Sequence, residues 1–224
     1  MGDSRDTSPV VVFDVDGTLL QTQLVTVPAV QQTFVRYGLP EPDVETICSF
    51  FGVPVEWYHD WLASLCPEGR VDEIVRATDK RELELIGESG QLYPGAREAI
   101  ESLHAMGCAM VISSNGPDDY VGEFLDAHDL RHFFSLVRAR GQGFEGKSHM
   151  LKDILDHYPG HRAVVVGDRG DDVESAHANG ALAVAVTYGF GSAEELRDAD
   201  ATLHAADEIP AAVCRLLGLQ EGDG

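Results

Sequence analysis

The sequence predicts an α/β protein in which a doubly wound parallel sheet carries a small all-helical cap, inserted after the first strand. Three observations support this prediction. A short apolar run, Val10–Phe13, is followed at once by two aspartates and a glycine. From residue 92 onward, strand and helix patterns alternate with short connections, as in repeated β-α-β units. Between these two regions, residues 20–88 show helical periodicity and no convincing strand.

The first predicted strand ends in carboxylates. Its residues, Val10–Phe13, form an apolar run rich in β-branched side chains, which is typical of a strand buried on both faces of a parallel sheet. Asp14 and Asp16 follow, and they should project to the same side if the strand geometry continues. They would lie at the carboxyl end of a core strand, where open α/β sheets bind ligands. Two like charges this close need a cation or a proton between them, so the pair is a first indication of a metal site.

Residues 20–88 interrupt the alternating pattern. Apolar residues recur there at helical spacing, and three turn segments (38–40, 52–54 and 67–69) divide the region into four helices. Because the insertion follows the first strand, these helices should lie above the carboxyl end of the sheet, over Asp14 and Asp16. We therefore expect an α/β core of residues 1–19 and 90–224, and a helical cap of residues 20–89.

Two sets of cap side chains have more than one interpretation. Trp57, Tyr58 and Trp61 lie on one predicted helix, where aromatic residues are more typical of core packing than of substrate contact. Arg76 and Lys80 lie one helical turn apart and could bind a second anionic group on a substrate. A solvated helix face is the favoured interpretation of that pair.

The rest of the core is predicted in chain order. Further apolar strands are expected at residues 109–113, 133–137, 163–166 and 181–186. Helical patterns lie between them and begin near Ala96, Pro117, Lys147 and shortly after Asp168. Residues 220–224 should fray.

Composition limits the compartment and the partners. The 224 residues carry a formal net charge of −22, which disfavours binding to nucleic acid and to anionic membranes. The first eight residues are polar and lack an apolar signal core, and no apolar stretch is long enough to span a bilayer. The four cysteines are scattered and form no C-x-x-C pair, as expected of reduced side chains in a cytosolic protein. We therefore expect a cytoplasmic protein.

Four polar segments should meet at one edge of the sheet. They are Asp14-x-Asp16-Gly17-Thr18, Ser114-Asn115, Lys147 and residues 167–172. These groups suit phosphoryl transfer, because a carboxylate can attack phosphorus to form an aspartyl phosphate and a second acid can protonate the leaving oxygen and then activate water. The nucleophile and the phosphate are both anionic, so Mg²⁺ held by oxygen ligands should bridge them. A lysine, a hydroxyl and backbone N–H groups can hold the remaining phosphoryl oxygens.

The order of these motifs resembles the haloacid dehalogenase (HAD)-like hydrolase superfamily, in its subgroup with a helical cap after the first strand. The resemblance covers about residues 10–217. Two further segments, Tyr93-Pro94-Gly95 and residues 188–196, are similar to the phosphoglycolate phosphatase-like branch. The chain departs from the common pattern at Gln21, where an acidic residue is frequent, and at Ser148, where proline is frequent. These departures concern the substrate and not the type of reaction.

The resemblance implies roles for five charged residues. Asp14 would be the nucleophile and a metal ligand. Asp16 would be the general acid/base, with its backbone carbonyl on the metal. Asp168 would be the third protein ligand to Mg²⁺, and Lys147 would neutralise the phosphoryl group. Asp172 would support the metal through its waters or orient Lys147.

The resemblance also implies a set of substrate-binding residues. Ser114 would hydrogen-bond the phosphoryl group, and it is preferred over Ser113 because Asn115 follows it. Gly17, Thr18 and Asn115 complete the predicted set.

The predicted function is Mg²⁺-dependent hydrolysis of a small phosphorylated metabolite through an aspartyl-phosphate intermediate, by a monomer or homodimer. A phosphomutase and a phosphonate- or pyrophosphate-cleaving enzyme are the alternatives within the superfamily. Phosphonate cleavage needs a lysine early in the cap to form an imine, and residues 18–58 contain no lysine. A dehalogenase would lack the second acid, Asp16. A phospho-receiver signalling domain is a more distant alternative, but such domains are shorter and have no helical insert.

Overall fold

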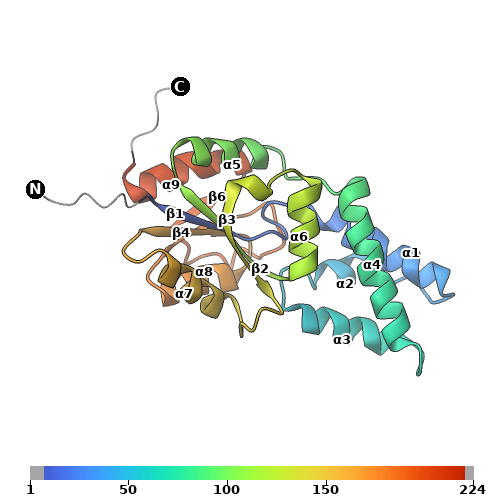
Figure 1. Ribbon diagram of the computed structural model, residues 1–224. Helices are drawn as coiled ribbons and strands as arrows, with labels where there is room; N and C mark the ends of the chain where they lie inside the picture. Colours follow the sequence, from blue (N-terminus) through green and yellow to red (C-terminus); the bar gives the residue numbers. More distant parts are fainter. Residues whose placement is uncertain (1–7, 220–224) are drawn as a thin grey trace, which may run out of the picture.

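The computed structural model describes residues 8–219 and contains a six-stranded parallel sheet covered by helices on both faces (Figure 1). The predicted α/β class is confirmed. Residues 1–7 and 220–224 lie outside the described part of the chain. The tail predicted to fray and most of the polar N-terminal segment belong to these residues.

The strand order, β3-β2-β1-β4-β5-β6, places the first strand in the middle of the sheet. The strands are β1 (Val10–Phe13), β2 (Ala109–Pro117), β3 (Phe134–Arg140), β4 (Ala163–Gly167), β5 (Leu182–Val186) and β6 (Ala201–Leu203). The chain runs outward from β1 to β3 on one side and from β4 to β6 on the other. The carboxyl end of β1 is therefore the point where the strand order reverses, which is where doubly wound sheets bind ligands. Five strands were predicted, and β6 was not.

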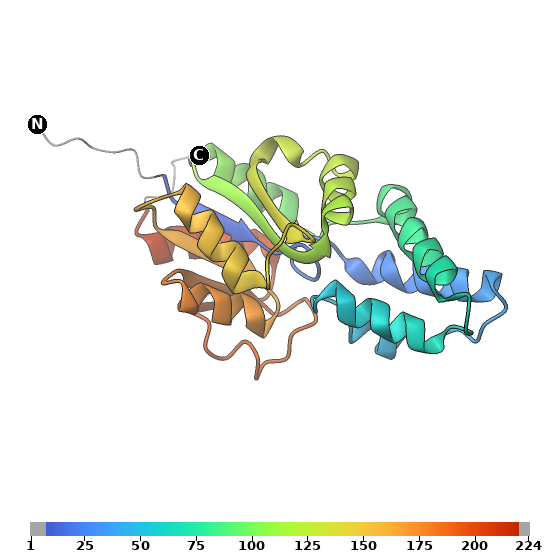
Figure 2. The same ribbon diagram turned by 60° about the horizontal axis from the view of Figure 1, so that its bottom comes forward.

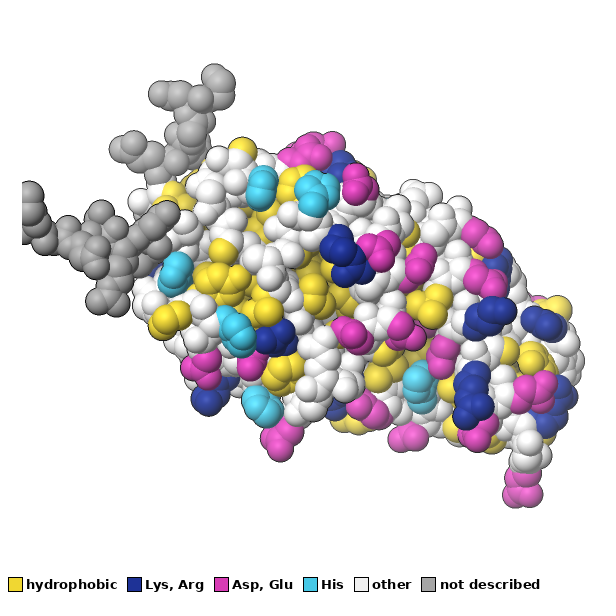
Figure 3. Space-filling view, in the orientation of Figure 1, with side chains coloured by type: hydrophobic (Ala, Val, Ile, Leu, Met, Phe, Trp, Pro, Cys, Tyr) yellow, Lys and Arg dark blue, Asp and Glu magenta, His cyan; other side chains and the backbone are white. Residues whose placement is uncertain are grey.

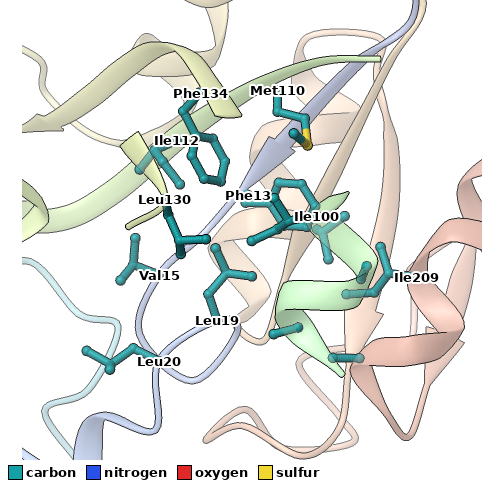
Figure 4. Packing of buried hydrophobic residues seen from close by; sticks show 14 of the residues in the cluster. Phe13, Val15, Leu19, Leu20, Ile100, Met110, Ile112, Leu130, Phe134 and Ile209 are labelled. Carbon is teal, nitrogen blue, oxygen red and sulfur yellow. The ribbon is translucent and has the colours of Figure 1, made fainter. Parts of the chain in front are cut away.

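Alternate residues of β1 pack against helices on opposite faces of the sheet. Val11 and Phe13 belong to the larger apolar cluster, which includes side chains of α5 (Ala96–Ala105), α6 (Asp118–Ala127) and α9 (Ile209–Leu217). Figure 4 shows Phe13 in this cluster together with Ile100 of α5 and Ile209 of α9. Val10 and Val12 belong to a second cluster with side chains of α7 (Lys147–His157) and α8 (Gly170–Ala178). Burial on both faces explains the continuous apolar run of this strand.

The helical insert, residues 20–89, contains the four predicted helices. These are α1 (Thr26–Arg36), α2 (Val44–Cys48), α3 (Val55–Leu65) and α4 (Val71–Ser89). Most of the insert has an apolar cluster of its own, which includes Phe34, Ile47, Leu62 and Ile74. Leu85 and Ile86, near the end of α4, instead join the large cluster of the α/β core. Figure 2 shows the insert extending from one end of the sheet.

Short helical turns complete the secondary structure, and they are η1 (Thr22–Leu24), η2 (Arg131–Phe133) and η3 (Ala206–Glu208). Acidic side chains are spread over the face of the molecule seen in Figure 3, on the core and on the insert alike. None of the helices in the described residues is both long enough and apolar enough to span a bilayer.

Candidate active site

The two aspartates after β1 do not extend the strand. The strand ends at Phe13, and the chain then turns sharply at Gly17, whose φ is +77°. Asp16 lies just before this turn and forms an isolated parallel bridge with Leu20. A side chain at position 17 would also place its Cβ 2.3 Å from a carboxylate oxygen of Asp168, so both the backbone angle and the space require glycine. The two aspartates before the turn have different hydrogen-bond partners.

Asp14 lies against a buried lysine. Lys147 is the first residue of α7, and its Nζ donates hydrogen bonds to Asp14 Oδ1 at 2.8 Å and to Asp172 Oδ1 at 2.5 Å. All three side chains are buried. Burial alone would lower the pKa of Lys147, but the two carboxylates outweigh it and raise this pKa, so the ammonium keeps its charge. Asp172 thus contacts the Lys147 ammonium, as it would have to in order to orient Lys147.

Asp168 follows β4 and approaches the same group. Its Oδ2 accepts a hydrogen bond from the backbone N–H of Phe190 at 2.6 Å. The hydroxyl of Thr18 lies 3.4 Å from Asp168 Oδ1 and 3.5 Å from Asp14 Oδ2, between the two carboxylates. Burial and the nearby charge of Asp14 raise the pKa of Asp168 to about 7. Thr18 and Asp168 thus lie where the strand-end motifs predicted them, next to Asp14.

The carboxylates of this site fit a divalent cation. Oxygen atoms of Asp14, Asp168 and Asp172 lie within 4.8 Å of one another, and all three residues are buried. Lys147 donates hydrogen bonds to two of these carboxylates, and the charge of Arg169 acts on the third. Burial, opposed by Lys147 and reinforced by the charge of Asp16, raises the pKa of Asp14 to about 6. Mg²⁺ prefers hard oxygen donors such as carboxylates, and the negative charges here outnumber the positive ones, so these residues could hold that ion.

Asp16 has a different environment. Its Oδ1 accepts hydrogen bonds from the hydroxyls of Thr22 and Tyr120, each at 2.7 Å. Burial raises the pKa of Asp16, with those two hydrogen bonds opposing the shift. A carboxyl group in this environment retains a proton at higher pH than an exposed aspartate. Thr22 and Tyr120 were not predicted as site residues, since neither belongs to a recognisable motif.

The polar segment of β2 supplies the remaining predicted residues. Ser114 is fully buried, and its Oγ accepts a hydrogen bond from the backbone N–H of Gly116 at 3.0 Å. Ser113 Oγ is directed instead to the sulfur of Met150, at 3.7 Å. Asn115 Nδ2 donates to the backbone carbonyl of Gly52 and to Asp171 Oδ2, both at 2.9 Å.

Asn115 therefore connects the core to the insert. Arg169 makes a second connection, because its Nη1 donates to the backbone carbonyl of Phe51 at 2.8 Å. The ring of Phe190 packs edge-on against Phe51, with 4.7 Å between ring centroids. The loop around Gly52 is thus fixed to the carboxyl edge of the sheet by polar and aromatic contacts. Asp171 lies in the first turn of α8, and its side chain accepts a hydrogen bond from Asn115.

A cavity of about 300 Å³ lies between the insert and the core. Asp16, Asn115 and Tyr120 line it from the core. From the insert, its wall includes Thr26, Phe50, Phe51, Val53, Val55, Tyr58, His59, Asp79, Glu82 and Leu83. Asp14, Lys147, Asp168 and Asp172 do not line it. Asp16 therefore separates a charged group, able to bind a phosphoryl group and a metal ion, from a cavity large enough for an organic group.

The structure also decides between the interpretations of the cap side chains. Trp57 is 63% exposed and is not a core residue, so the favoured interpretation is wrong for it. Tyr58 is buried but lines the cavity. Arg76 is exposed, and Lys80 is exposed and lies 3.7 Å from Glu84. Neither cation lines the cavity, which agrees with a solvated helix face.

Comparison with known proteins gives consistent matches over most of the chain. The model of a family described as haloacid dehalogenase-like hydrolase matches residues 11–186. A phosphoglycolate phosphatase from Aliivibrio fischeri is 27% identical over 199 residues, which cover 84% of this chain and 88% of the relative. A 5'-nucleotidase from Pseudomonas aeruginosa is 28% identical over 212 residues, which cover 92% of this chain and 95% of the relative.

A solved structure with the same fold is that of a predicted phosphoglycolate phosphatase from Haemophilus somnus. It matches with a TM-score of 0.82 and 21% identity, covering 94% of this chain and all of the other.

Proposed function

Since the chain belongs to the haloacid dehalogenase-like hydrolases, we propose that it is a Mg²⁺-dependent phosphatase that transfers the phosphoryl group of a small metabolite first to Asp14 and then to water. The observation that carries this proposal is the difference between the surroundings of Asp14 and those of Asp16. Asp14 lies 2.8 Å from the Lys147 ammonium, while Asp16 accepts hydrogen bonds from two hydroxyl groups and lines the cavity. An anionic nucleophile and a protonated acid are what the two halves of the reaction require.

The first step forms a bond between a carboxylate oxygen of Asp14 and phosphorus. The ester bond from phosphorus to the leaving oxygen breaks, and the carboxyl proton of Asp16 moves to that oxygen. The Lys147 ammonium attracts the phosphoryl oxygens and reduces the repulsion between them and Asp14. Thr22 and Tyr120 hold the Asp16 carboxyl in the orientation for proton transfer.

The second step releases phosphate. Asp16, now ionised, takes a proton from a water molecule, and the water oxygen bonds to phosphorus. The bond between phosphorus and Asp14 breaks, which restores both aspartates. We assign Asp14, Asp168 and the backbone carbonyl of Asp16 to the metal, with Asp172 beside them. When bound, Mg²⁺ supplies positive charge that offsets the repulsion between carboxylates and phosphate.

The substrate-binding set includes Gly17, Thr18, Ser114 and Asn115. Ser114 lies buried at the carboxyl end of β2, where its hydroxyl could donate to a phosphoryl oxygen. The relatives act on a phosphoglycolate and on a nucleotide by name, so a small phosphomonoester is the substrate class that they share. We further propose that residues 20–89 form a cap domain over the core of residues 1–19 and 90–224. The cytoplasm is the compartment that the scattered cysteines favour.

The proposal is tested with purified protein and p-nitrophenyl phosphate. Hydrolysis should require Mg²⁺ and stop on addition of EDTA. Asp14→Asn should lose about 10³-fold or more in kcat, because the amide cannot form the acyl phosphate. Asp60→Asn, the same change at an exposed position of α3, is the matched control and should keep full activity. A wild type without activity on a broad panel of phosphate esters would refute the proposal.

A further inference from the structure

The cavity beside Asp16 carries acidic and hydroxyl groups that the phosphoryl-transfer steps do not use. Because the proton of Asp16 goes to the leaving oxygen, the group attached to that oxygen must occupy the space that Asp16 faces. The chemistry of the cavity wall therefore bears on which leaving groups this chain accepts.

The acidic side chains deep in the cavity are already neutralised. Thr26 Oγ1 donates a hydrogen bond to Glu82 Oε1, and burial raises the pKa of Glu82 to about 8. Glu82 thus keeps its proton at neutral pH and presents a hydroxyl. Asp79 lies 3.0 Å from Nε2 of His59, and this contact raises the pKa of His59. Neither group offers an unbalanced negative charge to a cationic ligand.

The hydroxyl of Tyr58 has no hydrogen-bond partner. Its oxygen is buried, the residue is only 7% exposed, and the side chain lines the cavity. A buried hydroxyl without a partner costs free energy, which a ligand hydroxyl at hydrogen-bond distance would recover. Burial raises the pKa of Tyr58, so this hydroxyl stays neutral. It is the polar atom of the insert that most directly indicates a bound group.

Positive charge is missing from the same wall. The described residues that line the cavity include no lysine and no arginine, and His59 is already paired with Asp79. A carboxylate or a second phosphate on the substrate would lose its hydration there without gaining a counter-charge. Apart from His59 and the two tyrosines, the ionisable lining residues are all carboxylic acids, namely Asp16, Asp79, Glu82 and Asp119.

We propose that this cavity selects phosphomonoesters whose leaving alcohol is uncharged and bears hydroxyl groups, and that it rejects those carrying a carboxylate. The inference rests on the proposed phosphatase function and specifies its substrate class. Tyr58 and Glu82 would bind the substrate hydroxyls, while Phe50, Phe51 and Val55 would cover its carbon skeleton. Phosphoglycolate, whose leaving group carries a carboxylate, would be a poor substrate.

The test compares substrates that differ in one group. The pairs are 2-hydroxyethyl phosphate with phosphoglycolate, and glycerol 3-phosphate with 3-phosphoglycerate. The amine 2-aminoethyl phosphate extends the first pair to a cation. We expect kcat/KM at pH 7 to be at least about tenfold higher for each hydroxyl compound than for its charged analogues. Higher kcat/KM for any charged analogue than for its hydroxyl partner would overturn the inference.

Two cavity variants extend the test. Val53 is half-buried in the cavity wall and belongs to none of the apolar clusters among the described residues, so Val53→Lys adds a cation with little loss of packing. It should shift the ratio of kcat/KM toward phosphoglycolate by about tenfold. Tyr58→Phe should reduce kcat/KM for glycerol 3-phosphate by about 2–10-fold. Glu84→Gln, on the exposed side of α4, should change neither quantity.

Hydrolysis of p-nitrophenyl phosphate tests the phosphatase function separately from the selectivity of the cavity. If the wild type hydrolyses it and still prefers phosphoglycolate, the phosphatase function stands and the inference about the cavity fails. If Val53→Lys hydrolyses it with an unchanged substrate ratio, the charge of the cavity does not set selectivity. If the wild type hydrolyses no phosphate ester, the proposed function fails, and the inference fails with it.

Discussion

Replacing Glu82 by glutamine should stabilise the protein at alkaline pH and leave its stability near pH 5 almost unchanged. Glu82 lies in α4 with its side chain buried in the cavity wall, where it accepts a hydrogen bond from Thr26. Glutamine has nearly the same shape and can accept the same hydrogen bond. Glutamine cannot ionise, so the substitution measures how the ionisation of this one carboxyl group affects stability.

The size of the effect follows from the pKa. The ordinary pKa of a glutamate side chain is 4.5, whereas burial raises that of Glu82 in the folded protein to about 8. Between these values the folded state binds more protons than the unfolded state, so the wild type loses stability as the pH rises. Each pH unit is worth about 1.4 kcal/mol, and the whole interval amounts to roughly 5 kcal/mol. That is a large share of the roughly 5–15 kcal/mol that stabilises a typical domain.

The measurement is urea denaturation of the wild type and Glu82→Gln between pH 5 and pH 9. The difference in free energy of unfolding should grow in favour of the variant up to about pH 8 and then level off. Glu84→Gln removes an exposed carboxylate from the same helix and controls for the change in net charge. A difference that stays constant within about 0.5 kcal/mol over this range would show that Glu82 ionises normally and that burial does not raise its pKa.

Three further results are expected. Mg²⁺ at about 100 times its Kd should stabilise the wild type by about 2.7 kcal/mol, which corresponds to a rise of about 5–10 °C in the Tm, and an unchanged Tm would contradict the metal site. Gly17→Ala should destabilise the protein by more than about 2 kcal/mol in urea denaturation, because a Cβ there would clash with Asp168. Gly38→Ala, at a φ of +69° with open surroundings, should cost only about 1 kcal/mol, so equal losses for the two variants would refute the clash. Tyr120→Phe should lower kcat about tenfold for alkyl phosphates and much less for p-nitrophenyl phosphate, whose leaving group needs little proton transfer. An equal loss of kcat for both kinds of substrate would argue against an acid role for Asp16.

The features that could be predicted from sequence depend on local patterns and on parallel topology. A buried strand followed by carboxylates predicts a strand end, and all parallel strands end at the same edge of the sheet. Asp14, Lys147 and Asp168 could therefore be placed together although they are far apart in the chain. The strand β6 escaped prediction because it has only three residues, one of them exposed, and so lacks a continuous apolar run.

The features that were missed depend on contacts without a local pattern. Tyr120 contacts Asp16 across 104 residues of sequence, and in its own helix it is one aromatic residue among apolar neighbours. Glu82 falls in a charged helix where most carboxylates are exposed, and its burial depends on tertiary packing, which includes the contact with Thr26 of α1. The hydroxyl partners of Asp16 come from η1 and α6, which no pattern at the end of β1 indicates.

The different partners of Asp14 and Asp16 are the basis on which we propose different roles for these two residues. Lys147 opposes the effect of burial on the pKa of Asp14 and favours its anion, whereas Asp16 contacts hydroxyl groups that hydrogen-bond without supplying a formal charge. Asp16 is also coupled to the cavity, because its charge contributes to the raised pKa of Glu82. The coupling acts in both directions, so loss of the Glu82 proton above about pH 8 should make Asp16 hold its own proton more tightly. In our proposal, the acid that would protonate the leaving group is therefore electrostatically coupled to the wall that would select this group.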